Sequence, residues 1–132
     1  MSYRIITDTA CDFPQHMYEE LQLCVVPLTL NFRGQEHSNF TEEFILDMYK
    51  GMRNGESGST SAVNPDGWAN VIEPVLAAGE DALVMTFSSG LSTTYQSAVI
   101  AATELSEKYP DRKIRVIDTL CASLGQGLLV WY

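Results

Sequence analysis

Short β-branched and aromatic segments alternate with longer amphipathic segments along most of this chain. YRIIT (residues 3–7), ALVMTF (82–87) and KIRVID (113–118) have the composition of strands. Residues from about 64 to 79 and from about 91 to 109 have the apolar spacing of helices. Strands joined by helices of this length form right-handed crossovers. The pattern therefore predicts an α/β fold with a mainly parallel sheet and helices on both faces.

Turn and cap signals place the remaining segments. Residues 24–30 (CVVPLTL) predict a strand, in which Pro27 indicates an edge position or a bulge because proline cannot donate to the ladder. Arg33-Gly34-Gln35 predicts a hairpin turn.

Three further segments complete the secondary-structure prediction. Thr41 followed by two glutamates predicts a helix to about Met52. The polar stretch 54–64 predicts a loop, and an apolar helix is expected from about Cys121 to the last residues.

Length and charge exclude several classes of protein. The 132 residues are expected to form one domain, residues 1–132. A formal charge of -9 opposes binding to nucleic acid or to an anionic membrane surface. Because we find no transmembrane segment and no secretory signal, we expect a cytoplasmic protein, with its three cysteines reduced.

Small hydroxyl side chains are concentrated where the predicted strands end. The segments are Thr7-Asp8-Thr9, Ser88-Ser89-Gly90-Leu91-Ser92 and Asp118-Thr119, and the loop 57–61 is expected to reach the same edge. Ligands of parallel α/β sheets bind beyond the carboxyl ends of the strands, and the N–H groups of a helix N-terminus attract anions. Helix capping explains a single serine equally well. Ligand binding and capping therefore both stay open.

The lack of basic side chains narrows the expected ligand. No Lys or Arg lies between Arg53 and Lys108, and neither nucleotide-binding glycine pattern is present. Polyphosphates normally require such side chains or a metal. A ligand with a single charge, such as a carboxylate, suits neutral hydroxyl donors better, and no cofactor or metal is predicted.

Other chemistries have less support from the sequence. Asp8, Asp12 and Asp118 are read as helix caps and loop acceptors, because no His accompanies them at metal-ligand spacing. A Ser-nucleophile hydrolase or transferase using Ser89 or Ser92 is an alternative, but no His lies in the loops after the strands to activate a serine. A phosphometabolite-binding α/β domain is a further alternative, and the missing Lys and Arg count against it.

Five segments in order resemble the blocks of the DegV family. They are ITDTACDFP (6–14), VVPLTL (25–30), TS (60–61), SSGLSTTYQSA (88–98) and VIDTLCASLGQG (116–127). The resemblance implies the fold of a DegV N-terminal domain and a bacterial, lipid-binding function. It also implies that the protein is not itself an enzyme but holds a long-chain fatty acid for a separate ATP-binding fatty acid kinase subunit, which forms acyl phosphate for phospholipid synthesis.

The resemblance also implies which residues bind the ligand. Thr60 and Ser92 correspond to the side chains that hold the carboxylate. Ser61, Ser89 and Gly90 are expected to line the pocket, Asp8, Thr9 and Asp118 to support it, and Thr93, which replaces a family glycine, to narrow it.

The family's proteins are about twice as long as this chain. The resemblance therefore implies that the C-terminal DegV domain, which closes over the acyl chain and adds a basic or imidazole contact, is absent from this sequence. We expect the apolar helix that ends at Trp131-Tyr132 to leave a face suited to self-association.

Overall fold

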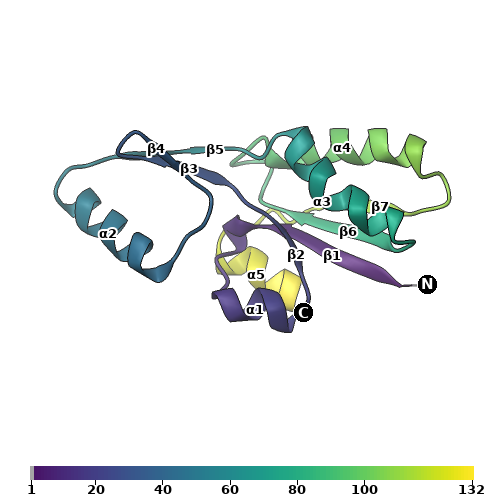
Figure 1. Cartoon of the computed structure of the whole chain (residues 1–132), viewed down its shortest axis with the longest axis horizontal. Coiled ribbons are helices and arrows are strands. Elements are labelled where there is room, and N and C mark those ends of the chain that lie inside the picture. The colour runs from purple at the N-terminus through teal and green to yellow at the C-terminus, as the bar shows by residue number, and fades with distance from the viewer. Residues whose placement is uncertain (1) are drawn as a thin grey trace.

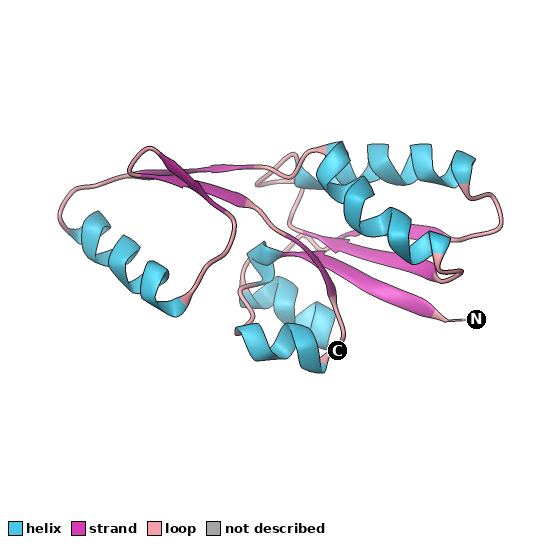
Figure 2. Cartoon of the chain, in the orientation of Figure 1, coloured by secondary structure: helices cyan, strands magenta, loops and turns pink. Residues whose placement is uncertain are grey.

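A parallel sheet of four strands forms the centre of the molecule in the computed structural model, which describes residues 2–132. The strands are β1 (Tyr3–Asp8), β2 (Cys24–Val26), β6 (Asp81–Thr86) and β7 (Ile114–Asp118), in the order β2-β1-β6-β7. All three pairings are parallel. The predicted α/β class is therefore confirmed (Figure 2).

Helices cover both faces of this sheet, as predicted. Helices α3 (Pro65–Ala77) and α4 (Thr94–Lys108) pack against each other and lie on one face. Helices α1 (Gln15–Glu20) and α5 (Leu124–Trp131) lie on the opposite face (Figure 1). The core lies mainly under α3 and α4, where Trp68 is fully buried and its indole N–H donates to the Thr94 carbonyl at 3.1 Å.

A second, antiparallel sheet corrects two sequence-based predictions. Its strands are β3 (Thr29–Phe32), β4 (Gln35–His37) and β5 (Gly58–Ser61), in the order β4-β3-β5. The single strand predicted at 24–30 is wrong, because the chain breaks at Pro27 and its two halves enter different sheets. The loop predicted at 54–64 is also wrong, because β5 pairs with β3 over four residues.

The second sheet and α2 (Glu42–Arg53) form a lobe beside the main sheet (Figure 1). The predicted hairpin turn joins β3 and β4, and both turn residues, Arg33 and Gly34, have positive φ, at 52° and 75°. Such a two-residue turn matches the twist of antiparallel strands.

Two helices begin later than predicted. Helix α4 starts at Thr94 rather than at 91 or 92, and α5 starts at Leu124 rather than near Cys121. A short 3₁₀ helix, η1 (Thr9–Cys11), which the sequence did not reveal, follows β1.

The carboxylate of Asp8, fully buried at the end of β1, joins three parts of the fold. Its Oδ2 accepts a hydrogen bond from the Phe87 N–H at 2.8 Å. Its Oδ1 accepts from the Ala10 N–H at 3.0 Å and from Gln126 Nε2 at 3.1 Å. Burial raises the pKa of Asp8 above its ordinary value of 3.8, although these three donors act in the opposite direction.

Replacing Asp8 by alanine tests this junction. The Asp8→Ala variant leaves buried N–H donors without an acceptor and is expected to lose about 2–4 kcal/mol of unfolding free energy near pH 7. Because the raised pKa lets the native state keep a proton that the unfolded chain has released, the wild type gains stability as the pH falls from 7 towards 4. Urea unfolding should therefore show a larger difference between wild type and variant near pH 4 than near pH 7. Asp111→Ala, on the surface, is the control.

Two glycines in α5 provide a matched test of how this helix docks. A Cβ on Gly127 would lie 2.9 Å from the Cys11 carbonyl oxygen and 2.8 Å from the Phe13 ring, whereas a Cβ on Gly125 would meet nothing closer than 3.6 Å. Gly127→Ala is therefore expected to destabilise the protein by about 1–3 kcal/mol through overpacking. Gly125→Ala should stabilise it by up to about 1 kcal/mol, because alanine favours helix. Equal effects in thermal or urea unfolding would contradict this docking.

Candidate ligand site at the carboxyl edge of the sheet

The loops that follow β1, β6 and β7 are tied together at one edge of the main sheet. Phe87, just after β6, donates to Asp8 at the end of β1. The Ser89 N–H donates to Asp118 Oδ1 at 3.1 Å, and the Thr119 hydroxyl donates to the Thr86 carbonyl at 2.7 Å. The three hydroxyl-bearing segments identified in the sequence thus converge at this edge, as parallel strand topology requires.

A pair of hydroxyls links this edge to the second sheet. Ser92 Oγ and Thr94 Oγ1 lie 2.8 Å apart, and Ser92 Oγ also accepts the Thr94 N–H at 3.1 Å. Thr94 Oγ1 accepts the Val63 N–H at 3.3 Å, two residues after the end of β5. The capping interpretation is thus correct in part, since Ser92 satisfies one N–H at the start of α4.

Ser92 and Thr94 each carry one hydroxyl proton. Only one of these protons can form the hydrogen bond between Ser92 Oγ and Thr94 Oγ1. Thr94 is fully buried, whereas Ser92 is partly exposed. If Thr94 donates to Ser92, the buried Thr94 hydroxyl is satisfied inside the protein, and the Ser92 proton is left for another acceptor. The opposite arrangement would leave a buried donor unpaired, which costs about 1–3 kcal/mol. The geometry therefore favours Ser92 as an outward donor.

The other predicted site residues differ in how freely they could bind a ligand. Thr60 and Ser61 on β5 are exposed, as are Gly90 and Thr93, and Thr93 is the N-cap of α4 without a side-chain capping bond. Thr60, Ser61 and Thr93 use their hydroxyls in no hydrogen bond within residues 2–132. Thr9 is engaged, since its hydroxyl accepts the Leu28 N–H at 3.0 Å.

Ser89 is engaged with Asp118. The hydrogen bond from the Ser89 side chain is the main cause that holds the pKa of Asp118 below its ordinary value, and the N–H groups of Leu120 and Ser89 act in the same direction. Asp118 is therefore ionised at neutral pH. Ser89 uses its proton on this carboxylate, which leaves Ser92 as the better donor for an external anion.

Sequence analysis missed Gln126 as a part of this edge. The side chain lies on α5, is fully buried, and donates through Nε2 to Thr7 Oγ1 and to Asp8 Oδ1, each at 3.1 Å. Its Oε1 is buried and accepts no hydrogen bond from the described residues. The available signal was one polar side chain between two glycines in an otherwise apolar helix.

The structure offers little for metal or nucleophile chemistry. In the part of the chain that is described, no three His, Cys, Asp or Glu side chains are grouped as metal ligands. The His37 ring packs on Phe44 in the second lobe, with centroids 4.2 Å apart, and His16 is exposed on α1. Neither imidazole hydrogen-bonds to Ser89 or Ser92 among residues 2–132.

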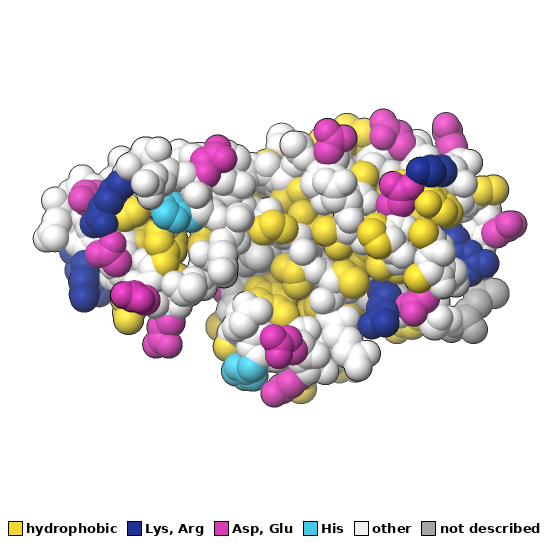
Figure 3. Space-filling view, in the orientation of Figure 1, with side chains coloured by type: hydrophobic (Ala, Val, Ile, Leu, Met, Phe, Trp, Pro, Cys, Tyr) yellow, Lys and Arg dark blue, Asp and Glu magenta, His cyan; other side chains and the backbone are white. Residues whose placement is uncertain are grey.

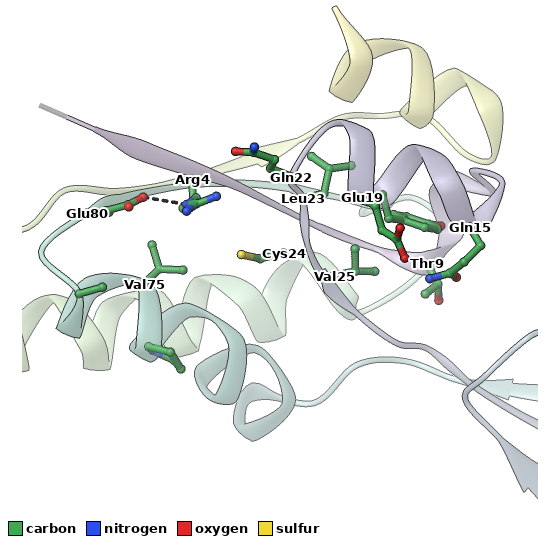
Figure 4. Close-up of a pocket in the computed structure, with 13 residues that line it drawn as sticks. Arg4, Thr9, Gln15, Glu19, Gln22, Leu23, Cys24, Val25, Val75 and Glu80 are labelled. Atoms are coloured by element: carbon green, nitrogen blue, oxygen red, sulfur yellow. Dashed lines mark hydrogen bonds and ion pairs between the residues drawn. The ribbon is translucent and has the colours of Figure 1, made fainter.

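A groove of about 660 Å³ lies elsewhere, along the edge strand β2 between α1 and α3 (Figure 4). The Arg4–Glu80 ion pair, at 2.9 Å, borders one end, and Thr9 and Gln15 border the other. Thr9 is the one predicted site residue that lines it. Thr60 and Ser92 do not line this groove.

Apolar side chains also reach the surface. Figure 3 shows them gathered in the middle of one face, between the lobe that carries α2 and the helices α3 and α4. On α5, Leu124 and Leu128 are 61% and 63% exposed. None of the helices between residues 2 and 132 is both long and apolar enough to cross a membrane.

Comparison with known proteins agrees with this architecture. The family model described as an uncharacterised protein of the DegV family matches residues 2–132. A DegV domain-containing protein of Clostridium perfringens is 41% identical over 130 residues, which cover 97% of this chain and 45% of that protein. The chain thus spans about half the length of the curated relatives that it matches.

Two solved structures illustrate the likeness. A fatty-acid-binding DegV family protein from Thermus thermophilus has a TM-score of 0.86 at 33% identity, over 99% of this chain and 45% of that one. The Streptococcus pneumoniae fatty acid kinase (Fak) B3 protein, loaded with linoleic acid, has a TM-score of 0.75 at 28% identity, over 93% of this chain and 43% of that one. From its sequence and its fold, this chain belongs to the DegV family.

Proposed function

We propose that this chain forms part of a fatty-acid-binding protein, in which Thr60 and Ser92 hold the carboxylate of a long-chain fatty acid. The observation that carries the proposal is the Ser92–Thr94 pair, because it leaves the Ser92 O–H free for an acceptor outside the protein. The fatty acids named for the structures from Thermus thermophilus and Streptococcus pneumoniae support the same class of ligand.

The start of α4 favours an anion at this position. The first N–H groups of a helix have no partner within the helix, and the helix dipole adds partial positive charge there. Helix α4 is 15 residues long and begins at Thr94, two residues after Ser92. Hydroxyls from Ser92 and Thr60, with the free amides of the first turn, would surround a carboxylate with donors. Ser61, Gly90 and Thr93 would line the rest of the head-group site.

Charge limits the affinity that these residues can supply alone. Asp118 is ionised close to Ser89, and the sequence has no Lys or Arg between 53 and 108. The hydroxyls must therefore overcome a repulsive carboxylate without a neighbouring cation. Since the relatives are about twice as long as this chain, we assign the remaining head-group contacts and the acyl enclosure to the family's other half.

The fatty acid would be presented to an ATP-using kinase subunit. The fatty acid kinase B3 protein among the structural relatives supports such a partner. In this scheme the kinase transfers the γ-phosphoryl group of ATP to a carboxylate oxygen, which gives acyl phosphate and ADP. Ser92 and Thr60 orient the carboxylate and take no part in bond making.

Replacement of Ser92 tests the carboxylate site. Ser92→Ala is expected to weaken palmitate binding by about 1.5–3 kcal/mol, the value of a hydrogen bond to a charged group. Ser89→Ala should have a smaller effect, because Ser89 already donates to Asp118. Isothermal titration calorimetry with palmitate measures both.

Matched controls separate this effect from changes in the fold. Ser106→Ala removes a hydroxyl that is bonded to the Ala102 carbonyl within α4, away from the site, and should bind palmitate like the wild type. Thr60→Val should act like Ser92→Ala, with Ser59→Ala as its control, because neighbouring strand residues point to opposite faces. If Ser92→Ala and Thr60→Val both bind palmitate with wild-type affinity, the proposed carboxylate site is wrong.

The kinase partnership predicts a coupled reaction. With palmitate, ATP and a fatty acid kinase subunit, the protein should support formation of acyl phosphate, which hydroxylamine traps as a hydroxamate. Protein and ATP without the kinase subunit should give none. Hydroxamate formed at the same rate with and without this protein would exclude a presenting role.

A further inference from the structure

We propose that Gln126 and Asp8 act together as positioning residues that hold the loop of residues 88–92 in its binding geometry, so that α5 controls the affinity of the site. The proposal rests on the proposed function, because the loop carries Ser92. It assigns a role to a buried side chain that does not reach the ligand itself.

The loop is a compact turn whose orientation is set from outside. Within it, the Leu91 and Ser92 N–H groups donate to the Ser88 carbonyl at 3.0 and 3.1 Å, and the Gly90 N–H donates to Ser88 Oγ at 3.2 Å. These bonds fix the shape of the turn but not its direction relative to the sheet. The direction depends on the bonds that leave the loop.

Apart from the bonds between Ser92 and Thr94 at the start of α4, three bonds connect this turn to the rest of the fold. Phe87, immediately before the loop, donates to Asp8 Oδ2 at 2.8 Å. The Ser88 N–H donates to the Cys121 carbonyl at 3.1 Å, and the Ser89 N–H donates to Asp118 at 3.1 Å. Asp8 is the buried anchor of the three, and it is the one that Gln126 contacts.

Gln126 fixes how the Asp8 carboxylate is oriented. Its Nε2 bridges Asp8 Oδ1 and Thr7 Oγ1, and the Thr7 hydroxyl itself donates to the Met85 carbonyl at 2.9 Å. Because the Thr7 proton is already used, Thr7 Oγ1 can only accept from Gln126. The NH₂ end of the Gln126 amide, and not its oxygen, therefore faces Thr7 and Asp8. With Oδ1 held by Gln126 and Ala10, Oδ2 is directed at the Phe87 N–H.

The buried amide is a poor choice for stability alone. Its Oε1 is unpaired among the described residues while the side chain is fully buried. An apolar side chain of similar size would avoid this desolvation penalty. A buried amide with one unpaired atom that orients a binding loop is the pattern expected of a functional position.

Helix α5 also has an exposed apolar face, through which a contact could change the affinity of the site. Gln126 and Gly127 point inwards, whereas Leu124 and Leu128 are exposed on the same helix. A contact that shifts α5 would move Gln126 against Asp8, and through Phe87 it would move the loop. The affinity for the fatty acid would then follow the position of the helix.

Gln126→Met tests the proposal, since methionine is unbranched and similar in length but cannot donate. Palmitate binding should weaken about tenfold, which corresponds to about 1.4 kcal/mol. The variant loses one of the three donors to Asp8 and is expected to stay folded with a lower urea midpoint. Amide hydrogen exchange should become faster at Phe87 and stay unchanged at Val84, in the buried core of β6. Gln15→Met, on the surface of α1, should change none of these.

A double-mutant cycle isolates the route through Asp8. The Asp8→Asn variant should lose affinity, and adding Gln126→Met to it should cause no further loss, because Gln126 acts through that carboxylate. Additive losses would overturn the proposal, as would an unchanged affinity in Gln126→Met or equal acceleration of exchange at Phe87 and Val84. If Gln126→Met does not fold, Gln126→Asn, whose shorter amide cannot bridge Thr7 and Asp8, carries the same measurements.

The exchange measurement needs no fatty acid, so the two proposals fail separately. Wild-type protein that does not bind palmitate would contradict the proposed function, while slow exchange at Phe87 that depends on Gln126 would still support the positioning role. Wild-type protein that binds palmitate, with Phe87 exchange independent of Gln126, would contradict only the positioning role.

Discussion

The hydrogen bond from the Phe87 N–H to the buried Asp8 carboxylate joins the first strand of the main sheet to the loop after β6, across 79 positions of sequence. Together with the bonds from the Ser88 N–H to Cys121 and from the Ser89 N–H to Asp118, it connects the loop of residues 88–92 to the sheet. The proposed positioning of Ser92 rests on this contact. Burying a carboxylate is unfavourable, and three N–H donors offset the cost.

The chemistry of the site follows from how hydroxyl protons are used. Ser89 donates to Asp118, Thr9 accepts from Leu28, and Thr94 is fully buried. These hydroxyls therefore stabilise the loops at the carboxyl edge of the main sheet. Among the described residues, Thr60, Ser61 and Thr93 have hydroxyls without a hydrogen-bond partner, and Ser92 is partly exposed beside the buried Thr94. Some of the Ser and Thr hydroxyls in these loops therefore hold the scaffold, while others are exposed.

Much of the fold was predictable because its signals are local. The β-branched runs that became β1, β6 and β7, the Thr41 cap of α2 and the Arg33-Gly34 turn each depend on neighbouring residues. The errors occurred where distant pairing decides. Residues 58–61 have the composition of a loop and form β5 only because β3 offers a partner strand. Pro27 indicated an edge position or a bulge within one strand, but only the pairing of the strands shows that the segments on its two sides belong to different sheets.

The sequence by itself determined the α/β class, the convergence of hydroxyl-bearing segments at the carboxyl edge, and the absence of Lys and Arg between Arg53 and Lys108, where two of these segments lie. These properties depend on periodicity and composition, which are local. Only the tertiary structure decided which hydroxyls are free and that Gln126 meets Asp8, because a hydrogen bond between residues 118 positions apart leaves no periodic trace in a sequence. The division of the hydroxyls between scaffold and surface is likewise a matter of burial, which the packing of distant segments sets.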